Sequence, residues 1–521
     1  MSPVRPALWT CLAPLLALGL LGCPADDGGA DGETSTSETS ASETSTETGA
    51  PTETSTETGG PCTAEGCACD PEAEAPCDPG LYCSESDQVC TAPACANGVV
   101  EEGEECDDGN ELEGDGCDQD CTFTELLAVE VGYENTCVLI EGGRVRCWGA
   151  NGKGELGLGN TEPIGDNETP GTVEDVLLGL PVLDLSVGDS HACVVLDDAN
   201  ARCWGSGASG RLGISNVATV GDDESPMQDV LAGDGVVEID AGGSHTCARL
   251  VDGSMRCWGA GFGGALGYGN PDTIGDDEHP VTIDVVPVGA SILAQATGIG
   301  HTCVITSEGA VRCWGAGGSG QLGYGNVEDV GVANTPAEVG DAAVVPADVD
   351  ADAAAIALAL GQNISCALYE GGEVLCWGVG FTGALGQGST ADIGDDELPS
   401  SFGAIELGAP AIAISAGDSH VCALLDTHEA RCWGANTAGQ LGLGTLDNLG
   451  DDELPTAVAA IDLGGPIAHI DAGGIHTCAI VETTNELYCW GLGSSGQLGY
   501  ANTANVGDDE LPLSAGPVEV F

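Results

Sequence analysis

The chain has 521 residues, more than one ordinary compact domain contains, and its length fits two or three domains. It carries 84 acidic residues against 10 basic ones, and Lys153 is its single lysine. Nucleic acids and anionic lipid surfaces bind clustered lysine and arginine, so a net charge of −74 excludes a nucleic-acid-binding protein. The 83 glycines and an aromatic content of 4% favour short strands joined by turns over a helical enzyme.

The first residues direct export. Arg5 precedes an apolar stretch, residues 7–21, that is too short to span a bilayer as a stable helix. The stretch ends in Leu-Leu-Gly-Cys at residues 20–23, which resembles the lipobox of bacterial lipoproteins. The resemblance implies a signal peptide at 1–22 and lipid attachment to Cys23, whereas a plain secretory signal is the alternative. With Pro24 after the cysteine, we expect an outer-membrane or cell-surface lipoprotein held to the membrane only by its lipid.

Two further segments separate this signal from the rest of the chain. Residues 23–60 are rich in Thr, Ser and Glu without apolar periodicity, which predicts a disordered tether. Residues 61–121 contain ten cysteines, an even number typical of disulfides in an oxidising compartment, and zinc is the less favoured alternative. Within them, residues 95–121 resemble the cysteine-rich repeat of myxobacterial surface proteins.

The remaining residues, 122–521, repeat seven times. Each repeat contains Cys-Trp-Gly, and a second cysteine precedes that motif by ten residues, or by eleven in the last repeat. The seven tryptophans are Trp148, Trp204, Trp258, Trp314, Trp377, Trp433 and Trp490. The fourteen cysteines, in pairs, are Cys137 and Cys147, Cys193 and Cys203, Cys247 and Cys257, Cys303 and Cys313, Cys366 and Cys376, Cys422 and Cys432, and Cys478 and Cys489.

The spacing predicts one disulfide-linked hairpin per repeat. In the first unit a three-residue loop, residues 141–143, sets Ile140 opposite Arg144 and therefore Cys137 opposite Cys147. The seventh hairpin gains one loop residue and one residue between its cysteines, which preserves this register. A short strand pattern lies before each hairpin and another follows its Leu-Gly turn, giving four strands per repeat.

The predicted fold class is all-β: a seven-bladed β-propeller of four-stranded antiparallel blades, because repeated sheets that close into a ring protect their edges. Whether the two ends of the repeat region share one blade is left open by the sequence. The motif Gly-Ser-His-Thr-Cys at residues 243–247, together with Cys-Trp-Gly and Gln-Leu-Gly, resembles the regulator of chromosome condensation repeat. This resemblance implies a seven-bladed propeller; its nucleotide exchange activity does not fit a surface lipoprotein.

Three recurrent features are candidate sites. Five histidines precede the first cysteine of a hairpin by two residues (His191, His245, His301, His420 and His476), and we expect them to bond to local backbone rather than to a metal. Five arginines precede Cys-Trp-Gly, and we expect packing beside tryptophan or ion pairing. Loops reading Gly-Asp-Asp-Glu are candidate calcium or basic-partner sites, and ordinary solvated turns are the alternative; the calcium candidates are Asp222, Asp223, Glu224, Asp276, Asp277 and Glu278.

No motif for catalysis is recognisable in the sequence. We therefore expect a non-enzymatic, monomeric binding or scaffold protein without a required cofactor, whose partner is an extracellular protein or glycan. The alternatives are a propeller inhibitor of an extracellular enzyme, and a propeller hydrolase or lyase. The aromatic candidates for contact with a partner are Phe262, Tyr268, Tyr324 and Phe381.

The hairpin register makes a direct prediction for the disulfides. Non-reducing peptide mapping of the exported protein should recover Cys137 linked to Cys147, and the six equivalent pairs, because directly opposed residues satisfy disulfide geometry. A disulfide that joins cysteines of two different repeats would contradict the repeat assignment.

Overall fold

The computed structural model describes residues 82–83, 90–91, 100, 104, 106–107, 109, 114–119 and 121–521. The chain divides into two compact units, residues 1–94 with 101–103, and residues 95–100 with 104–521. In the first unit, β1 (Tyr82–Cys83) pairs antiparallel with β2 (Cys90–Thr91). The predicted signal peptide, Cys23 and the tether lie outside the described residues. Among the described residues, no helix has the length and apolar character to cross a membrane.

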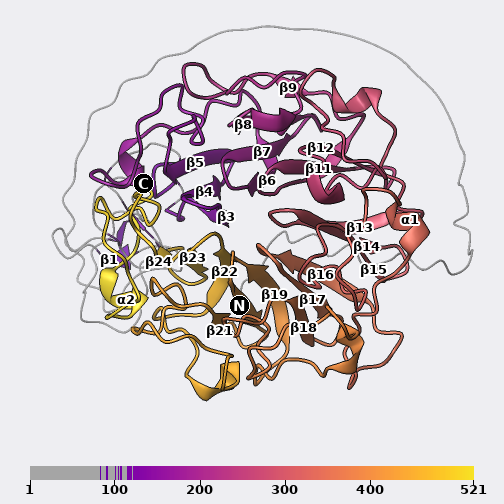
Figure 1. The fold of residues 1–521 in the computed structure, drawn as a ribbon. Coiled ribbons are helices and arrows are strands. Elements are labelled where there is room, and N and C mark those ends of the chain that lie inside the picture. The colour runs from indigo at the N-terminus through magenta and orange to yellow at the C-terminus, as the bar shows by residue number, and fades with distance from the viewer. Residues whose placement is uncertain are drawn as a thin grey trace, which may run out of the picture. The chain divides into compact units, whose positions relative to one another are not determined.

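The second unit contains seven antiparallel sheets, and Figure 1 shows them side by side in a ring. Blade 1 consists of β3 (Leu126–Val131), β4 (Asn135–Ile140) and β5 (Arg144–Gly149). The other blades follow in chain order: blade 2, β6 (Val182–Val187), β7 (His191–Leu196), β8 (Ala201–Gly205) and β9 (Asp229–Val230); blade 3, β10 (Val236–Ala241), β11 (His245–Leu250) and β12 (Met255–Gly259); blade 4, β13 (Ile292–Thr297), β14 (His301–Thr306) and β15 (Val311–Gly315); blade 5, β16 (Ala355–Leu360), β17 (Ile364–Tyr369) and β18 (Val374–Gly378); blade 6, β19 (Ala411–Ala416), β20 (His420–Leu425) and β21 (Ala430–Gly434); blade 7, β22 (Ile467–Ala472), β23 (His476–Val481) and β24 (Leu487–Gly491). The predicted seven-bladed all-β fold is confirmed.

The fourth strand predicted for every blade forms in one blade. Only blade 2 has one, β9, whose Val230 lies opposite Ala201 of β8. In the other six blades a single helical turn that begins with proline occupies the preceding residues: η1 (Pro170–Thr172), η4 (Pro280–Thr282), α1 (Pro336–Val339), η5 (Pro399–Ser401), η6 (Pro455–Ala457) and α2 (Pro512–Ala515). The outer segment then contributes one ladder hydrogen bond, as when the Val176 N–H donates to the carbonyl of Val145 at 2.8 Å. Proline, which lacks an N–H, thus replaces the start of a strand.

The disulfide hairpins occupy the middle of each blade. Cys137 lies directly opposite Cys147, and all seven propeller pairs are joined with Cα atoms 4.0 to 4.1 Å apart. Cys478 and Cys489 remain opposed despite the longer loop. Cys106 is joined to Cys117 in the segment before the propeller. The seven hairpin tryptophans are fully buried, and together with the cystines and aliphatic residues they form one continuous core.

Each hairpin tryptophan also fixes its blade to the preceding one. The indole Nε1–H of Trp258 donates to the carbonyl of Arg211 in blade 2. Arg211 immediately precedes a Leu-Gly turn. The equivalent bond, 2.8 to 3.0 Å long, forms at all seven blade interfaces: Trp148 to Gln497, Trp204 to Glu155, Trp258 to Arg211, Trp314 to Ala265, Trp377 to Gln321, Trp433 to Ala384 and Trp490 to Gln440. Since a buried indole N–H without a partner is costly, this bond sets the position of neighbouring blades.

The recurrent histidines are also inter-blade residues, so the expectation of bonding to local backbone was wrong. His245 Nε2 lies 2.9 Å from the hydroxyl of Thr302 in blade 4. That hydroxyl donates its only proton to the carbonyl of Ala265, the same oxygen that accepts from Trp314, so His245 must be the donor. His191, His301, His420 and His476 make the same contact to Thr246, Ser365, Thr477 and Thr136.

Two interfaces lack this histidine, and at both the next blade also lacks the hydroxyl residue that the histidine would contact. Ile364 of blade 5 replaces the histidine, and the next blade has Val421 where the others have a hydroxyl. Blade 1 has Asn135, and blade 2 has Ala192 at the partner position. The tryptophan bonds are present at both interfaces. The histidine and the hydroxyl are therefore present or absent together, so neither occurs alone at any of the seven interfaces.

Arginines before Cys-Trp-Gly join the outer parts of the blades. Arg146 and Arg202 bond the carbonyls of Val520 and Leu178 in the preceding blade. Arg146 also pairs with Asp175 at 2.6 Å, and Arg202 pairs with Asp229 at 2.7 Å, as the ion-pairing interpretation predicted. These contacts hold the ring together at its circumference.

The ring closes without exchange of strands between its ends. Val518 donates to Leu487, so the last residues complete blade 7 rather than blade 1. Blade 7 meets blade 1 through the bond from Trp148 to Gln497, and through Val131, whose N–H donates to Asp471 at 2.7 Å. Every blade is thus a continuous piece of chain, and closure depends on non-covalent contacts between the first and last blades, including backbone hydrogen bonds such as that from the Gly474 N–H to the Gly132 carbonyl at 3.0 Å.

The paired histidine and hydroxyl predict a non-additive loss of stability. Thr302→Val should lower the free energy of unfolding by about 1–3 kcal/mol, because His245 loses its buried acceptor. The double variant His245→Ile with Thr302→Val reproduces the natural pair at residues 364 and 421, and it should be less destabilised than the sum of its single variants. Denaturant unfolding of the four proteins measures this coupling, and strictly additive losses would contradict it.

Candidate functional site

The propeller has two faces that differ in their loops. The loop face carries the turns that follow each Cys-Trp-Gly, such as residues 261–264, and the Gly-Asp-Asp-Glu loops, such as residues 275–278. The hairpin face, at the opposite ends of the same strands, carries the seven hairpin tips, such as residues 141–143. The chain enters the propeller at the hairpin face, because Thr124, just before β3, accepts from the side chain of Asn485 in the hairpin tip of blade 7.

Two large aromatic side chains project from the loop face. Phe262 is 87% exposed in the turn of blade 3, and Phe381 is 77% exposed at the equivalent position of blade 5. Blade 4, between them, has Gly318 at this position. By contrast, the hydroxyls of Tyr268 and Tyr324 bond the backbone of Cys257 and Cys313. Both tyrosines are half-buried and their hydroxyls bond within their own blade, so less of either side chain is accessible to a partner than of the two phenylalanines.

The acidic loops form compact carboxylate triplets on the same face. Five of them bring three ligand oxygens within 4.8 Å of one another: Asp222–Glu224, Asp276–Glu278, Asp395–Glu397, Asp451–Glu453 and Asp508–Glu510. A hydrogen bond with Asp452, burial and repulsion from Asp452 and Asp451 raise the pKa of Glu453 to about 7. The triplets therefore concentrate like charge, which a divalent cation or a basic partner would offset.

The acidic loop of one blade lies against the turn of the blade before it. Gly154 has φ +71°, and a Cβ there would come within 2.4 Å of the backbone nitrogen of Asp222. Blade 4 is the exception to the acidic series, with Gly331-Val-Ala-Asn334 in place of Gly-Asp-Asp-Glu. This loop is the neighbour of the turn that carries Phe262, because Gly264 approaches Val332 in the same way. Phe262 thus lies beside the one gap among the acidic loops.

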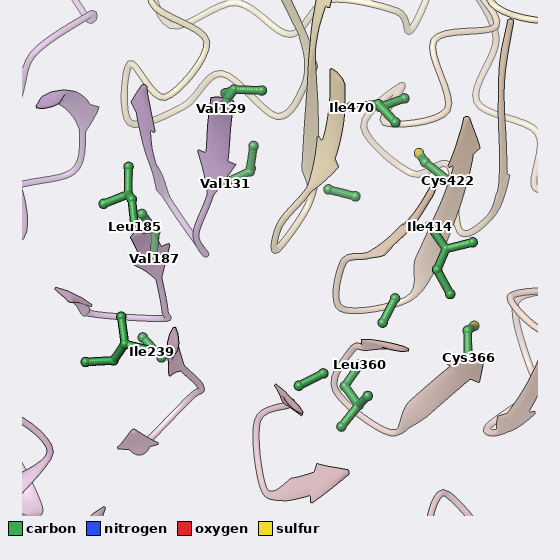
Figure 2. Packing of buried hydrophobic residues seen from close by; sticks show 14 of the residues in the cluster. Val129, Val131, Leu185, Val187, Ile239, Leu360, Cys366, Ile414, Cys422 and Ile470 are labelled. Carbon is green, nitrogen blue, oxygen red and sulfur yellow. The ribbon is translucent and has the colours of Figure 1, made fainter. Parts of the chain in front are cut away.

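A second set of carboxylates, which the sequence analysis missed, lies on the innermost strands. The Asp240 carboxylate of β10 accepts from the Thr297 N–H of the next blade at 2.7 Å, and Asp184 accepts from the Ile239 N–H at 2.9 Å. These donors belong to strands with no further strand beside them. The carboxylates therefore satisfy N–H groups that would otherwise be unpaired at the inner edge of the sheet. Figure 2 shows Val129, Leu185, Ile239, Ile414 and Ile470 on these strands around the axis of the ring.

Burial determines the protonation of this inner set. Burial, followed by repulsion from Glu238, raises the pKa of Asp240 to about 7. The pKa of Asp184 is also raised to about 7, mainly by burial. Burial, followed by repulsion from Asp471, Asp184 and Asp240, raises the pKa of Glu130 well above its ordinary value. These inner carboxylates could have been recognised in the sequence as acidic residues at alternate positions of a short apolar strand, as in residues 236–241.

Comparison with known proteins agrees with this architecture. The RCC1-like domain matches residues 109–458, more than half of the chain, and the regulator of chromosome condensation (RCC1) repeat matches residues 467–497. The chain belongs to the RCC1-like family. A separate match to a domain of unknown function, DUF4215, covers residues 76–122 and includes part of the cysteine-rich region.

Individual RCC1-like relatives cover most of the ring. The ultraviolet-B receptor UVR8 of Arabidopsis thaliana is 31% identical over 325 residues, 62% of this chain and 67% of the receptor. The human E3 ubiquitin-protein ligase HERC2 is 28% identical over 367 residues, which are 69% of this chain but 7% of that ligase. The crystal structure of Prp20p from Saccharomyces cerevisiae superposes with a TM-score of 0.53 at 20% identity, covering 66% of this chain and 80% of Prp20p. These likenesses support a propeller that serves as a binding or scaffold module.

The inner carboxylates predict a specific pH dependence. Asp240 has a raised pKa in the folded protein, so its stabilising contribution is complete below its unfolded pKa of 3.8 and is lost as the pH rises through about 7. Asp240→Asn removes this titration. Relative to the unsubstituted protein, its free energy of unfolding should therefore improve between pH 4 and pH 7, by at most about 1.4 kcal/mol per pH unit.

The matched control is Asp252→Asn at an exposed hairpin tip. Hydrogen bonds from Ser254 lower the pKa of Asp252, which is the opposite direction to Asp240, so its replacement should give no such gain. Parallel stability profiles for Asp240→Asn and the unsubstituted protein would contradict the assignment.

Proposed function

We propose that this protein is a non-catalytic, exported surface lipoprotein that binds an extracellular protein or glycan through the loop face of its propeller. The observation that carries the proposal is the exposure of Phe262 and Phe381 at equivalent turns of one face. Exposed aromatic side chains beside a polar rim are typical anchors of a binding surface. The acidic triplets around them favour a partner with basic groups.

The position of the chain entry supports the choice of face. Residues leading into β3 lie at the hairpin face, where the Arg144 guanidinium donates to the carbonyl of Gly114. The loop face is therefore free of this entering segment. The disulfides are consistent with an oxidising, extracellular location.

A second candidate function is inhibition of an extracellular enzyme, and the same two phenylalanines favour it, since an inhibitor also needs exposed anchors. It predicts that the captured partner is an enzyme whose turnover falls on binding. A hydrolase or lyase is the third candidate, which turnover of a glycan panel would reveal. The calcium hypothesis for the triplets Asp222–Glu224 and Asp276–Glu278 predicts that the protein binds calcium in a calorimetric titration.

The test is capture from extracellular fluid and intact cells with the complete protein, compared with its Phe262→Ala, Phe381→Ala double variant. Loss of two anchors of this size should weaken retention of a specific partner at least roughly tenfold. The control is Val217→Ala with Leu446→Ala, two aliphatic residues that are 57% and 52% exposed in loops of blades 2 and 6. Equal retention by all three proteins would contradict a loop-face site centred on the phenylalanines.

A further inference from the structure

The innermost strand of every blade has the same irregularity close to the hairpin face. In blade 1 the pairing shifts between Leu126 and Ala128, which leaves Leu127 as a bulged residue outside the ladder. The same shift follows the first residue of the innermost strand in all seven blades. A β-bulge redirects one side chain away from the regular face of the sheet, so seven side chains leave the blade interfaces at one level of the ring.

Six of these seven bulged residues are large aliphatics, and all six are exposed. We call them the bulge ring: Leu127, Leu183, Val237, Leu293, Ile356 and Ile412, with exposed fractions of 41 to 63%. The seventh position is Ala468, which is also exposed. In a chain with 84 acidic residues, six unpaired apolar side chains in one circle are a repeated feature rather than scattered surface leucines.

The bulge ring is surrounded by carboxylates. The hairpin tip of each blade bonds the chain just before the innermost strand, as when the Glu141 N–H donates to the carbonyl of Glu125, two residues before Leu127. All seven tips carry at least one exposed acidic residue: Glu141, Asp197, Asp252, Glu308, Glu370, Asp426 and Glu482. Near these tips, Arg144 pairs with Asp175, and His428 Nδ1 lies 3.2 Å from a carboxylate oxygen of Glu482.

We propose that the bulge ring and its acidic rim are a second binding surface, which takes a cationic amphipathic segment of a partner protein. Its apolar side chains would lie on the aliphatic ring, and its lysines or arginines would face the seven tips. Charge complementarity selects this occupant. A second copy of this chain and an anionic membrane surface both carry the same sign of charge as the rim, and would be repelled. The surface lies on the face opposite Phe262 and Phe381, so it does not depend on the function proposed above.

The test uses the complete protein and a fluorescein-labelled peptide made only of leucine and lysine in an amphipathic helical order. Binding is followed by anisotropy at physiological salt, where exposed charge alone is screened. The unsubstituted protein should bind the peptide, and Leu183→Ser with Leu293→Ser should weaken binding roughly tenfold or more, since two apolar contacts are lost. A peptide with the same composition in scrambled order should bind no better than the double variant does.

The controls separate this surface from general acidity and from the loop face. Val327→Ser with Leu446→Ser removes two aliphatic residues of the loop face that are similarly exposed, and it should leave peptide binding unchanged, as should Phe262→Ala with Phe381→Ala. Equal affinity of the Leu183, Leu293 variant and the unsubstituted protein, with both melting normally, would overturn the proposal. So would binding to anionic vesicles in place of the peptide, or a dimer in sedimentation that the same two substitutions dissociate.

Discussion

The hydrogen bond from each buried tryptophan to the preceding blade is the interaction on which the ring depends. A blade of three strands cannot cover its own faces, and its interior becomes a core only when a neighbour lies against it. The indole N–H fixes where that neighbour lies, because it has to reach one carbonyl, such as that of Arg211 for Trp258. The hydroxyl of Thr246 reaches the same oxygen, and His191 adds a third group. One carbonyl thus organises each interface, and seven such interfaces close the ring.

The buried polar groups between blades respond to pH in opposite directions. Burial lowers the pKa of His245 from its ordinary value of 6.5 to about 4. Its stabilising contribution is therefore fully present above pH 6.5 and is lost as the pH falls through about 4. Burial raises the pKa of Asp184 to about 7, so its contribution is lost as the pH rises. Both kinds of group form a hydrogen bond with the neighbouring blade: His245 donates to Thr302, and Asp184 accepts from the Ile239 N–H. The propeller therefore combines an acidic exterior with imidazole and carboxyl groups between its blades whose charged forms burial disfavours.

Blade number and hairpin register could be predicted because they are local. The distance between Cys137 and Cys147 and the period of Cys-Trp-Gly depend only on nearby residues. The fourth strand was overestimated because its apolar pattern is real, while a proline-led turn such as η1 takes up the residues before it. The inter-blade role of the histidines was missed because their partners lie about one repeat away. The sequence nevertheless contained a signal of this contact, since the blade with Ile364 in place of the histidine is followed by the blade with Val421 in place of the hydroxyl.

The candidate binding surfaces were predicted only in part. Phe262 and Tyr268 both follow a Cys-Trp-Gly, but the hydroxyl of Tyr268 returns to the backbone of Cys257 while Phe262 has no polar atom to hold it inward. The bulge ring was invisible in the sequence because a bulge changes which face a residue occupies, and alternation alone assigns Leu127 to the sheet. Placement on a face is a property of the assembled ring.

All seven hairpin tryptophans are bonded across blade interfaces. Hydrogen exchange of the indole N–H groups, followed by two-dimensional NMR of the protein labelled with ¹⁵N-tryptophan, tests it most directly. The expected result is seven slowly exchanging propeller indoles, whose protection is lost together when the ring opens. Rapid, independent exchange of several of them under native conditions would contradict it.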